Sequence, residues 1–436
     1  MEPTIHLVAE TTVSTTFMVV ALIAIILQSI YILVGLFGKG PKYKIKRNDP
    51  GAVDEDHFLE MVESLSDAQS NPHTTVNVFA NGENFYEAEL EAIRNARESV
   101  NLEAYIFQKG EVMTRFVDTL TAKAREGVEV RLVLDGLGSA GTSEDDLKSL
   151  LDAGGQVAFY HPLRFGSIPN YNNRTHREVM VIDGKIAFVG GAGVADHWMI
   201  TTPKRRRWRD TMVRVEGDAV TNLQSTFVEN WLESCGELLT GSKFFPKCEE
   251  KGDSVALVVN STPSAGGSTR ARVLFQLLLS SARESIHITT PYFLPDHSMC
   301  EELKRAQKRG VDVRILVPGK HNDHLLTRSS SRLAYGRLLQ HGIRIFEYLP
   351  SMLHAKILLI DGKWSVLGST NFDNRSFGIN DEVNLAVRDE RLNARLEADF
   401  QHDLSEAKEI SFEEWKRRPI LERGPELLGW ILERQQ

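Results

Sequence analysis

The chain repeats one ground plan, and this repeat limits the folds available to it. The phrase ARESV at 96–100 recurs as ARESI at 282–286, and each copy runs into a strand-like apolar segment. A helix-like stretch follows each copy and ends in a matching phrase, REGVEVR at 125–131 and KRGVDVR at 308–314. The glycine in each phrase suits a helix C-cap, and the apolar run after it suits a buried strand. Two copies of strand, helix and strand predict two similar halves.

The order of the elements predicts the fold class and the domain boundaries. Strands that alternate with helices are typical of α/β units, so we expect two α/β halves, each a mostly parallel sheet flanked by helices. A length of 436 residues also favours two units over one core. The expected order is an N-terminal anchor with a basic flank at 1–47, a linker at 48–76, a first half at 77–250, and a second half with a C-terminal helical tail at 251–436.

A histidine motif closes the ground plan in each half. The second copy contains His354, Lys356, Asp361 and the loop Gly368-Ser369-Thr370-Asn371. The first copy has the same spacing, with His176, Glu178, Asp183 and the loop Gly190-Gly191-Ala192-Gly193. Two such motifs indicate a composite site with one histidine from each half. The first copy departs from the second where Glu178 replaces the lysine and Gly193 replaces the asparagine.

The geometry of a strand gives the second motif its chemistry. Side chains alternate across a strand, so His354 and Lys356 point to the same side. A cation beside an imidazole, facing a loop of small residues that contains Asn371, suits a cluster of anionic oxygens. The same geometry places Glu178 beside His176 in the first copy.

These residues resemble the phospholipase D superfamily, whose signature H-x-K-x4-D-x6-G-[GS]-x-N occurs twice per active site. The second motif matches it completely, and the first departs at Glu178 and Gly193. The N-terminal anchor, the length and the phrases around Arg174–Arg177 and Trp208–Asp210 look like the bacterial cardiolipin synthase branch. The resemblance covers about residues 77–400. It implies a phosphatidyltransferase of the phospholipase D-like fold that uses no metal and no cofactor.

The resemblance also implies roles for individual residues. One histidine attacks the phosphorus to form a phosphohistidine, and the other acts as general acid and then base; we assign these roles to His176 and His354, an order that can be reversed. Lys356 and Asn371 hold the nonbridging phosphate oxygens. The remaining positions that the resemblance adds are the orienting carboxylates Asp210 and Glu382, the motif aspartates Asp183 and Asp361, which we expect to hold strand ends, and Ser369 and Gly191 on the substrate-binding loops.

Glu178 leaves two further hypotheses open. A carboxylate near a phosphodiester repels it unless the carboxylate is paired or protonated. On the first hypothesis, the first half is inactive and the protein is a membrane scaffold. On the second, Glu178 has another use, such as contact with a glycerol hydroxyl of the second substrate. The persistence of His176, Asp183 and Asp210 favours an active first half.

An uncharged stretch near the N-terminus predicts a membrane anchor. Residues 11–38 carry no charge, and Phe17–Phe37 is long enough to cross a bilayer. No Lys or Arg precedes this stretch, whereas five follow it between Lys39 and Arg47. By the positive-inside rule we expect a single-pass protein of the cell inner membrane with its catalytic part in the cytoplasm. A buried core helix is the alternative interpretation.

The leading function is conversion of two phosphatidylglycerol molecules into cardiolipin and glycerol. The acceptor alcohol and the oligomeric state stay open, and water as acceptor would make the protein a phospholipase D. A phosphodiesterase acting on single-stranded nucleic acid is a second class. The net charge of −8 argues against it, although the basic run Lys204–Arg207 offers a local site for phosphate. We therefore expect a phospholipid substrate, a membrane and no nucleic acid as partners.

Overall fold

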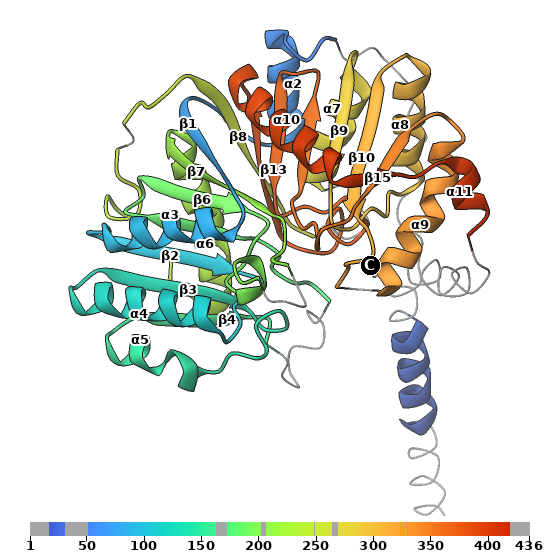
Figure 1. Ribbon diagram of the computed structural model, residues 1–436. Coiled ribbons are helices and arrows are strands. Elements are labelled where there is room, and N and C mark those ends of the chain that lie inside the picture. Colours follow the sequence, from blue (N-terminus) through green and yellow to red (C-terminus); the bar gives the residue numbers. More distant parts are fainter. Residues whose placement is uncertain are drawn as a thin grey trace, which may run out of the picture.

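One continuous sheet runs through both halves of the molecule. The computed structural model describes residues 17–30, 51–162, 172–201, 206–247, 249–263, 269–323 and 325–418. Within these ranges fifteen strands share a single sheet. Its two halves meet where β1 (Ser70–Ala80) pairs antiparallel with β8 (Ser254–Ser261). Figure 1 shows the halves as two lobes side by side, the first in blue to green and the second in yellow to red.

The two halves have the same strand order. From the central seam outward, the first half runs β1-β7-β6-β5-β2-β3-β4 and the second runs β8-β14-β13-β12-β9-β10-β11, followed by the edge strand β15 (Ala407–Glu409). The strands of the first half are β2 (Ser99–Ala104), β3 (Glu129–Asp135), β4 (Gln156–Tyr160), β5 (Val179–Ile182), β6 (Ile186–Gly190) and β7 (Thr211–Gly217). Their counterparts are β9 (Ser285–Thr289), β10 (Asp312–Pro318), β11 (Arg344–Tyr348), β12 (Ile357–Ile360), β13 (Trp364–Gly368) and β14 (Glu382–Arg388).

The predicted two α/β halves are confirmed, but the expectation of mostly parallel sheets is wrong. Only β2-β3-β4 and β9-β10-β11 pair in parallel, and the other neighbours in each half are antiparallel. One reversal in each half, between β5 and β6 and between β12 and β13, comes from the motif aspartate and the glycine after it. Asp183 and Gly184 have φ of 53° and 61°, and Asp361 and Gly362 have 52° and 66°. Asp-Gly pairs in this conformation reverse the chain, so each histidine motif forms a hairpin.

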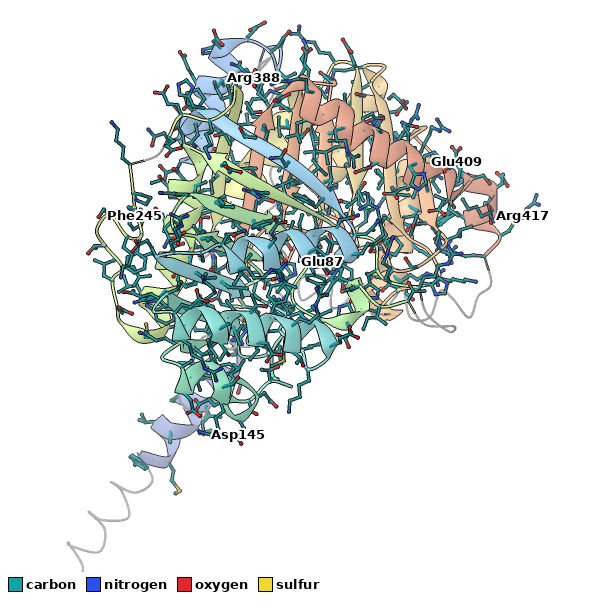
Figure 2. The ribbon with its side chains drawn as sticks, turned by 60° about the vertical axis from the view of Figure 1, so that its left-hand side comes forward. Glu87, Asp145, Phe245, Arg388, Glu409 and Arg417 are labelled. Carbon is teal, nitrogen blue, oxygen red and sulfur yellow. The ribbon has the colours of Figure 1, made fainter. Side chains whose placement is uncertain are left out.

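Helices cover both faces of the sheet. The glycines expected to end helices do so, since Gly127 and Gly310 follow α4 (Glu111–Arg125) and α8 (His297–Lys308) with φ of 91° and 95°. The other helices near the sheet are α3 (Gly82–Arg94), α5 (Lys148–Asp152), α6 (Ala219–Cys235), α7 (Arg270–Ser281), α9 (Leu325–Leu339), α10 (Glu390–Ser405) and α11 (Phe412–Lys416). Charged side chains such as Glu87 and Asp145 project outward from the helical layer (Figure 2).

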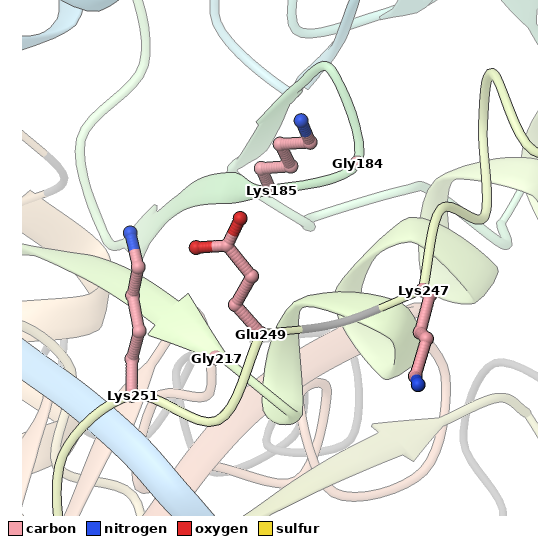
Figure 3. A pocket seen from close by; sticks show the side chains of 6 residues that line it. All are labelled: Gly184, Lys185, Gly217, Lys247, Glu249 and Lys251. Atoms are coloured by element: carbon pink, nitrogen blue, oxygen red, sulfur yellow. The ribbon is translucent and has the colours of Figure 1, made fainter.

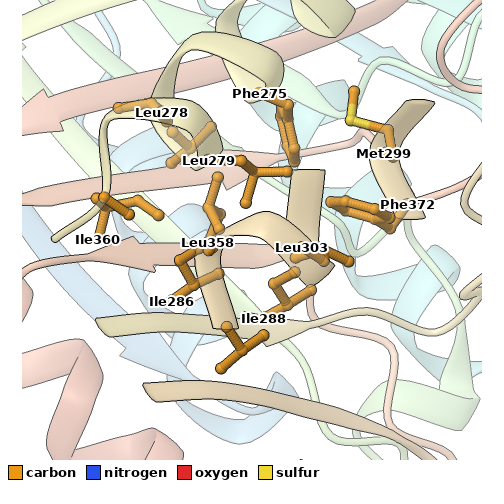
Figure 4. Close-up of a cluster of buried hydrophobic side chains, with 14 of the residues drawn as sticks. Phe275, Leu278, Leu279, Ile286, Ile288, Met299, Leu303, Leu358, Ile360 and Phe372 are labelled. Carbon is orange, nitrogen blue, oxygen red and sulfur yellow. The ribbon is translucent and has the colours of Figure 1, made fainter. Parts of the chain in front are cut away.

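The core of the second half lies between the sheet and α7 and α8. Figure 4 shows Phe275 and Leu278 of α7 above Ile286 and Ile288 of β9, with Leu358 of β12 beside them. Each of these side chains is at most 5% exposed. Burial of such apolar side chains is the main force that holds the strands, and hence the motif that follows them, in place.

The segment expected to be a linker is part of the folded body. Helix α2 (Asp56–Ser66) buries Phe58, whose ring meets Trp364 edge-on with centroids 5.9 Å apart. Trp364 also donates a hydrogen bond to the Val53 carbonyl at 2.7 Å. Since β1 begins at Ser70, the described part of the predicted linker, residues 51–76, supplies both a helix for the second half and the start of the seam. Polar composition hid this role because only three of the eleven α2 residues, Phe58, Val62 and Ser66, are buried.

The N-terminal stretch is described only in part. Residues 17–30 form a helix (Figure 1), and its large apolar side chains are exposed. Among the described residues, no helix combines the length and the apolar character that crossing a membrane requires. The rest of the predicted anchor, its basic flank, Lys204 and Arg205 of the basic run, and the C-terminal tail after residue 418 lie outside the described residues.

Candidate active site

Two short backbone bridges bring the histidine motifs together. Thr175 pairs with Asp381, and the His176 N–H donates to the Asp381 carbonyl at 2.9 Å. In the same way Arg209 pairs with Leu353, beside the His354 N–H that donates to the Arg209 carbonyl at 2.7 Å. Each bridge joins one half to the other. Each histidine is therefore held next to a residue at the start of the other half's strand, β14 or β7.

The carboxylate partners of the histidines are exchanged between the halves. His176 of the first half has its Nδ1 3.0 Å from Glu382 Oε2, and His354 of the second half has its Nδ1 2.8 Å from Asp210 Oδ2. Both carboxylates are fully buried. A carboxylate at Nδ1 holds the imidazole tautomer that carries its proton there, which leaves the Nε2 lone pair for chemistry. The structure thus forms two crossed His–carboxylate pairs.

Each orienting carboxylate is fixed by further donors. Asp210 accepts from the Trp198 indole N–H at 3.0 Å and from its neighbour's backbone, the Thr211 N–H, at 2.8 Å. Glu382 accepts a short hydrogen bond from the Ser369 hydroxyl. Ser369 was predicted on the substrate-binding loop, but it is fully buried and its hydroxyl faces Glu382 and the backbone of Val383. Ser369 therefore lies on the buried side of the Glu382 carboxylate and helps to hold it.

Charge in the second half is balanced around His354. Burial, and after it the charge of Lys356, lower the pKa of His354, while Asp210 opposes them. Burial also lowers the pKa of Lys356 against the pull of Asp210 and Glu382. Burial alone would raise the pKa of Asp210, but the hydrogen bond from His354 and the nearby cations hold it below its ordinary value. The site therefore holds His354 and Lys356 as basic groups beside the paired carboxylate of Asp210, and a bound phosphate would stabilise both in their charged forms.

Lys356 reaches across the seam toward the loop of the first motif. Its ammonium lies 3.1 Å from Nε2 of His354 and 3.4 Å from the Gly191 carbonyl. A Cβ at Gly191 would lie 2.9 Å from that ammonium and 3.2 Å from Asp210. Gly191 therefore provides the space through which the lysine passes. Asn371 is 4% exposed, and its Oδ1 has no hydrogen-bond partner in the described part of the chain, which leaves that oxygen able to accept from a ligand.

The motif aspartates lie at the opposite ends of their strands from the histidines. Asp183 accepts from the backbone N–H groups of Arg97, Glu98 and Ser99 at 2.7–3.1 Å. Asp361 does the same with residues 283–285 at 2.8–2.9 Å. These contacts tie each hairpin turn to the ARES phrase of its own half. They explain why the phrase and the aspartate recur together, and they give Asp183 and Asp361 no contact with the histidines.

A pocket beside the first hairpin turn is separate from this site. It has a volume of about 30 Å³ and includes Gly184, at the end of β5 away from His176. Figure 3 shows Glu249 between Lys185 and Lys251, while Lys247 points away. Lys251 is also paired with Glu216 at 2.7 Å. One of its three lysines, Lys251, is thus paired within the protein.

Several residues around the histidines carried no sequence signal. The Tyr105 ring meets the His176 ring edge-on at 5.2 Å, and the rings of Trp198 and Trp208 lie 5.4 and 5.2 Å from that of His354. Burial raises the pKa of Asp373 to about 6, and His176 is among the charges that act on it. Only Trp208 stood in a phrase that the resemblance had singled out.

Comparisons with known proteins agree with this geometry. The family model described as "Cardiolipin synthase, PLD-like domain" matches residues 90–231 and 276–404, one match in each half. The chain belongs to this family. It is therefore a phospholipase D-superfamily phosphatidyltransferase with a phospholipid substrate.

Similar proteins cover most of the chain. It is 32% identical over 377 residues to cardiolipin synthase 1 of Bacillus anthracis, across 84% of this chain and 74% of that protein. It is 34% identical over 358 residues to a probable cardiolipin synthase of Bacillus subtilis, across 82% and 71%. The fold resembles phosphatidylserine synthase of Haemophilus influenzae, with a TM-score of 0.64, 14% identity and coverage of 86% of this chain and 99% of that one.

Proposed function

We propose that the protein is a membrane-bound cardiolipin synthase that transfers a phosphatidyl group from one phosphatidylglycerol to another through a phosphohistidine. The crossed pairing of His176 with Glu382 and of His354 with Asp210 carries this proposal. Two oriented imidazoles suit a double displacement, in which one acts as nucleophile and the other moves protons. The naming of the relatives as cardiolipin synthases supports the choice of lipid.

The first step breaks the bond between phosphorus and the glycerol head group. Nε2 of His176 attacks the phosphorus, while the Nδ1 proton stays on the side of Glu382. The leaving glycerol oxygen takes a proton from Nε2 of His354. The bond formed is N–P, the bond broken is P–O, and free glycerol departs.

The second step regenerates the enzyme. His354, now neutral, takes the proton from a hydroxyl of a second phosphatidylglycerol, whose oxygen attacks the phosphohistidine. The P–O bond of cardiolipin forms, the N–P bond breaks, and His176 returns to its starting state. Water in place of the second lipid would give phosphatidic acid by the same route.

The negative charge of the bound substrate explains how His354 becomes protonated before the first step. His354 must carry a proton when the glycerol leaves, yet burial and Lys356 lower its pKa in the free protein. A phosphodiester bound between Lys356 and Asn371 brings a negative charge, which raises the pKa of the imidazole. Substrate binding thus supplies the protonated form that the first step needs.

We also propose that residues 11–38 anchor the protein in the cell inner membrane with the catalytic part on the cytoplasmic side. The absence of charge from this stretch, the exposed apolar side chains at 17–30 and the cations after it support the proposal. Protease treatment of sealed vesicles of known orientation tests it. Cleavage of the catalytic part only when its predicted side faces out is the expected result, and protection on that side would refute it.

The reaction is tested by incubating membranes that contain the protein with phosphatidylglycerol labelled in the head group. Cardiolipin and an equal amount of free glycerol are expected from the wild type, and neither from His176→Ala or His354→Ala. His402→Ala, at an exposed position outside the site, is the matched control. In a parallel incubation with phosphatidylglycerol labelled at phosphorus, an alkaline quench, which preserves the N–P bond, should trap label on the peptide containing residue 176. Phosphatidic acid without cardiolipin would show hydrolysis, and activity that survives His176→Ala would refute a double displacement through that residue.

A further inference from the structure

The structure gives Glu178 a backbone partner in place of a substrate. Its Oε1 accepts hydrogen bonds from the N–H groups of Tyr105 at 3.1 Å and Ile106 at 3.4 Å. The side chain is 5% exposed, and burial raises its pKa well above the ordinary value. A buried carboxyl that accepts from two successive N–H groups fixes the segment that carries them. In this structure that segment carries Tyr105, whose ring contacts the imidazole of the first histidine.

Tyr105 connects Glu178 with His176. Its ring meets the imidazole edge-on, with centroids 5.2 Å apart and an interplanar angle of 65°. Its carbonyl accepts from the Ser139 hydroxyl at 2.9 Å, and a Cβ at Gly138 would lie only 2.3 Å from that carbonyl oxygen. Tyr105 is therefore held at its backbone N–H by Glu178 and at its carbonyl by the loop after β3. The Tyr105 ring also packs on this loop, since a Cβ at Gly138 would lie 2.7 Å from its Cδ2 and 2.8 Å from its Cε2.

Gly193 completes this arrangement. A Cβ at this position would lie 2.3 Å from the Ile106 carbonyl oxygen and 3.0 Å from Glu178 Oε1. The Val194 N–H donates to the same carbonyl at 2.8 Å, which fixes the close approach. The asparagine of the family signature would not fit here. The two departures of the first motif are therefore one coupled change.

The second half shows why the change is confined to the first. The alignment that matches Ala96 with Ala282 places Pro291 opposite Tyr105. Proline has no N–H, so a carboxylate at position 356 would lack the counterpart of the Tyr105 N–H, one of the two donors that Glu178 uses. Lys356 instead extends to the Gly191 carbonyl at 3.4 Å. The backbone near Glu178 thus offers the N–H donors that a carboxyl needs, whereas the backbone near Lys356 does not offer the same pair.

We propose that Glu178 is a positioning residue that holds Tyr105 edge-on against His176, and that Gly193 provides the space this contact needs. The inference rests on the proposed function of His176. The Tyr105 ring limits how the imidazole can turn, so Nε2 is presented to the phosphorus in one orientation. Lys356 is then the motif lysine that binds the phosphoryl oxygens, because the first motif has Glu178 at the matching position.

Steady-state kinetics with phosphatidylglycerol test the inference. Glu178→Ala and Tyr105→Ala should each lower kcat about 100-fold with KM within about threefold, because a misplacement of about 1 Å has that effect on an oriented nucleophile. Glu178→Gln keeps an acceptor oxygen for the two N–H groups and should stay within about tenfold of wild type. The double alanine variant should be no slower than either single variant. A loss in Glu178→Gln equal to that in Glu178→Ala would show that the carboxyl acts chemically and would overturn the proposal.

A second measurement requires no lipid. Diethyl pyrocarbonate modifies accessible imidazoles, and the rate at the peptide containing His176 can be followed by mass spectrometry on the full chain in detergent. The rate should rise in Glu178→Ala and Tyr105→Ala and stay at the wild-type value in Glu178→Gln, with the His402 peptide as internal control. Equal rates in all variants would overturn the inference. If the wild type fails to turn over phosphatidylglycerol while these rates differ as expected, the proposed function fails and the positioning role stands.

Restoring the signature of the family gives a third outcome. The variant Glu178→Lys with Gly193→Asn replaces an acceptor with an ammonium beside two N–H donors and introduces a Cβ near the Ile106 carbonyl. It should lose at least as much activity as Glu178→Ala. Wild-type kcat in this variant would overturn the proposal.

Discussion

Replacing Glu89 with Gln should remove a large part of the pH dependence of stability. Glu89 lies on the buried stripe of α3 together with Phe85 and Ile93, and it is 6% exposed. It lines a cavity of about 20 Å³ that Glu178 also lines. Burial raises the pKa of Glu89 from 4.5 to about 8. The equivalent position in the second half is Phe275, so there the same helix face carries an apolar side chain.

The sign follows from which state holds the proton. Below pH 4.5 the carboxyl is protonated in both states, and stability does not depend on it. Between pH 4.5 and about 8 the unfolded chain loses the proton and the folded protein keeps it, so stability falls as pH rises. At about 1.36 kcal/mol per pH unit, the whole change is about 5 kcal/mol, of which about 3.5 kcal/mol falls between pH 5 and pH 8. Above that range Glu89 adds no further slope.

Urea unfolding of the full chain in detergent, followed by tryptophan fluorescence at several pH values, measures this slope. Glu89→Gln should be more stable than wild type at pH 8 and should lose about 3.5 kcal/mol less between pH 5 and pH 8. Glu91→Gln, which removes an exposed carboxyl from the same helix, is the matched control. Parallel pH profiles for wild type and Glu89→Gln would refute the argument, because Glu89 would then ionise in the folded protein as it does in the unfolded chain.

Three other predictions concern the site and its support. Asp210→Asn should lower the rate of lipid transfer by about 10³–10⁴, because the second histidine loses the anion that holds its tautomer; kcat with labelled lipid measures this. Gly191→Ala should raise KM or lower kcat, because the new Cβ would lie 2.9 Å from the Lys356 ammonium and displace it. The control is Gly141→Ala, where a Cβ meets nothing within 4 Å. Asp361→Ala should lower the melting temperature, since three backbone N–H groups lose an acceptor at about 1–3 kcal/mol each.

Local patterns predicted the repeat and its motifs well, because they depend on neighbours in the chain. The ARES phrases and the glycines at 127 and 310 have a fixed place in each half. The strand directions were mistaken because the order of strands and helices was taken as the guide. The Asp-Gly pairs at 183 and 361 were the better guide, since their positive φ values turn each motif into a hairpin.

Contacts between the halves could not be predicted from one sequence. Asp210 and Glu382 were singled out by resemblance, but nothing in the chain tells which histidine each one meets. The hydrogen-bond partners of Glu178 could not be predicted either. They are two backbone N–H groups, and the residue types in a sequence do not reveal which backbone groups a side chain will meet. Tyr105 and Trp198 stand far in sequence from the histidines they contact, and aromatic residues at such positions most often belong to the core.

The seam between β1 and β8 joins the two halves in one chain, and this affects which substitutions the protein can accumulate during evolution. In an assembly of two identical chains, every substitution appears on both sides of the symmetry axis, so a carboxylate in place of the lysine would remove both cations at once. Covalent joining of the halves lifts this constraint. One half can then keep Lys356 while the other adopts Glu178 and Gly193, and neither change needs to be tolerated twice. The asymmetry of this site is a freedom that a single joined chain has and a symmetric pair does not.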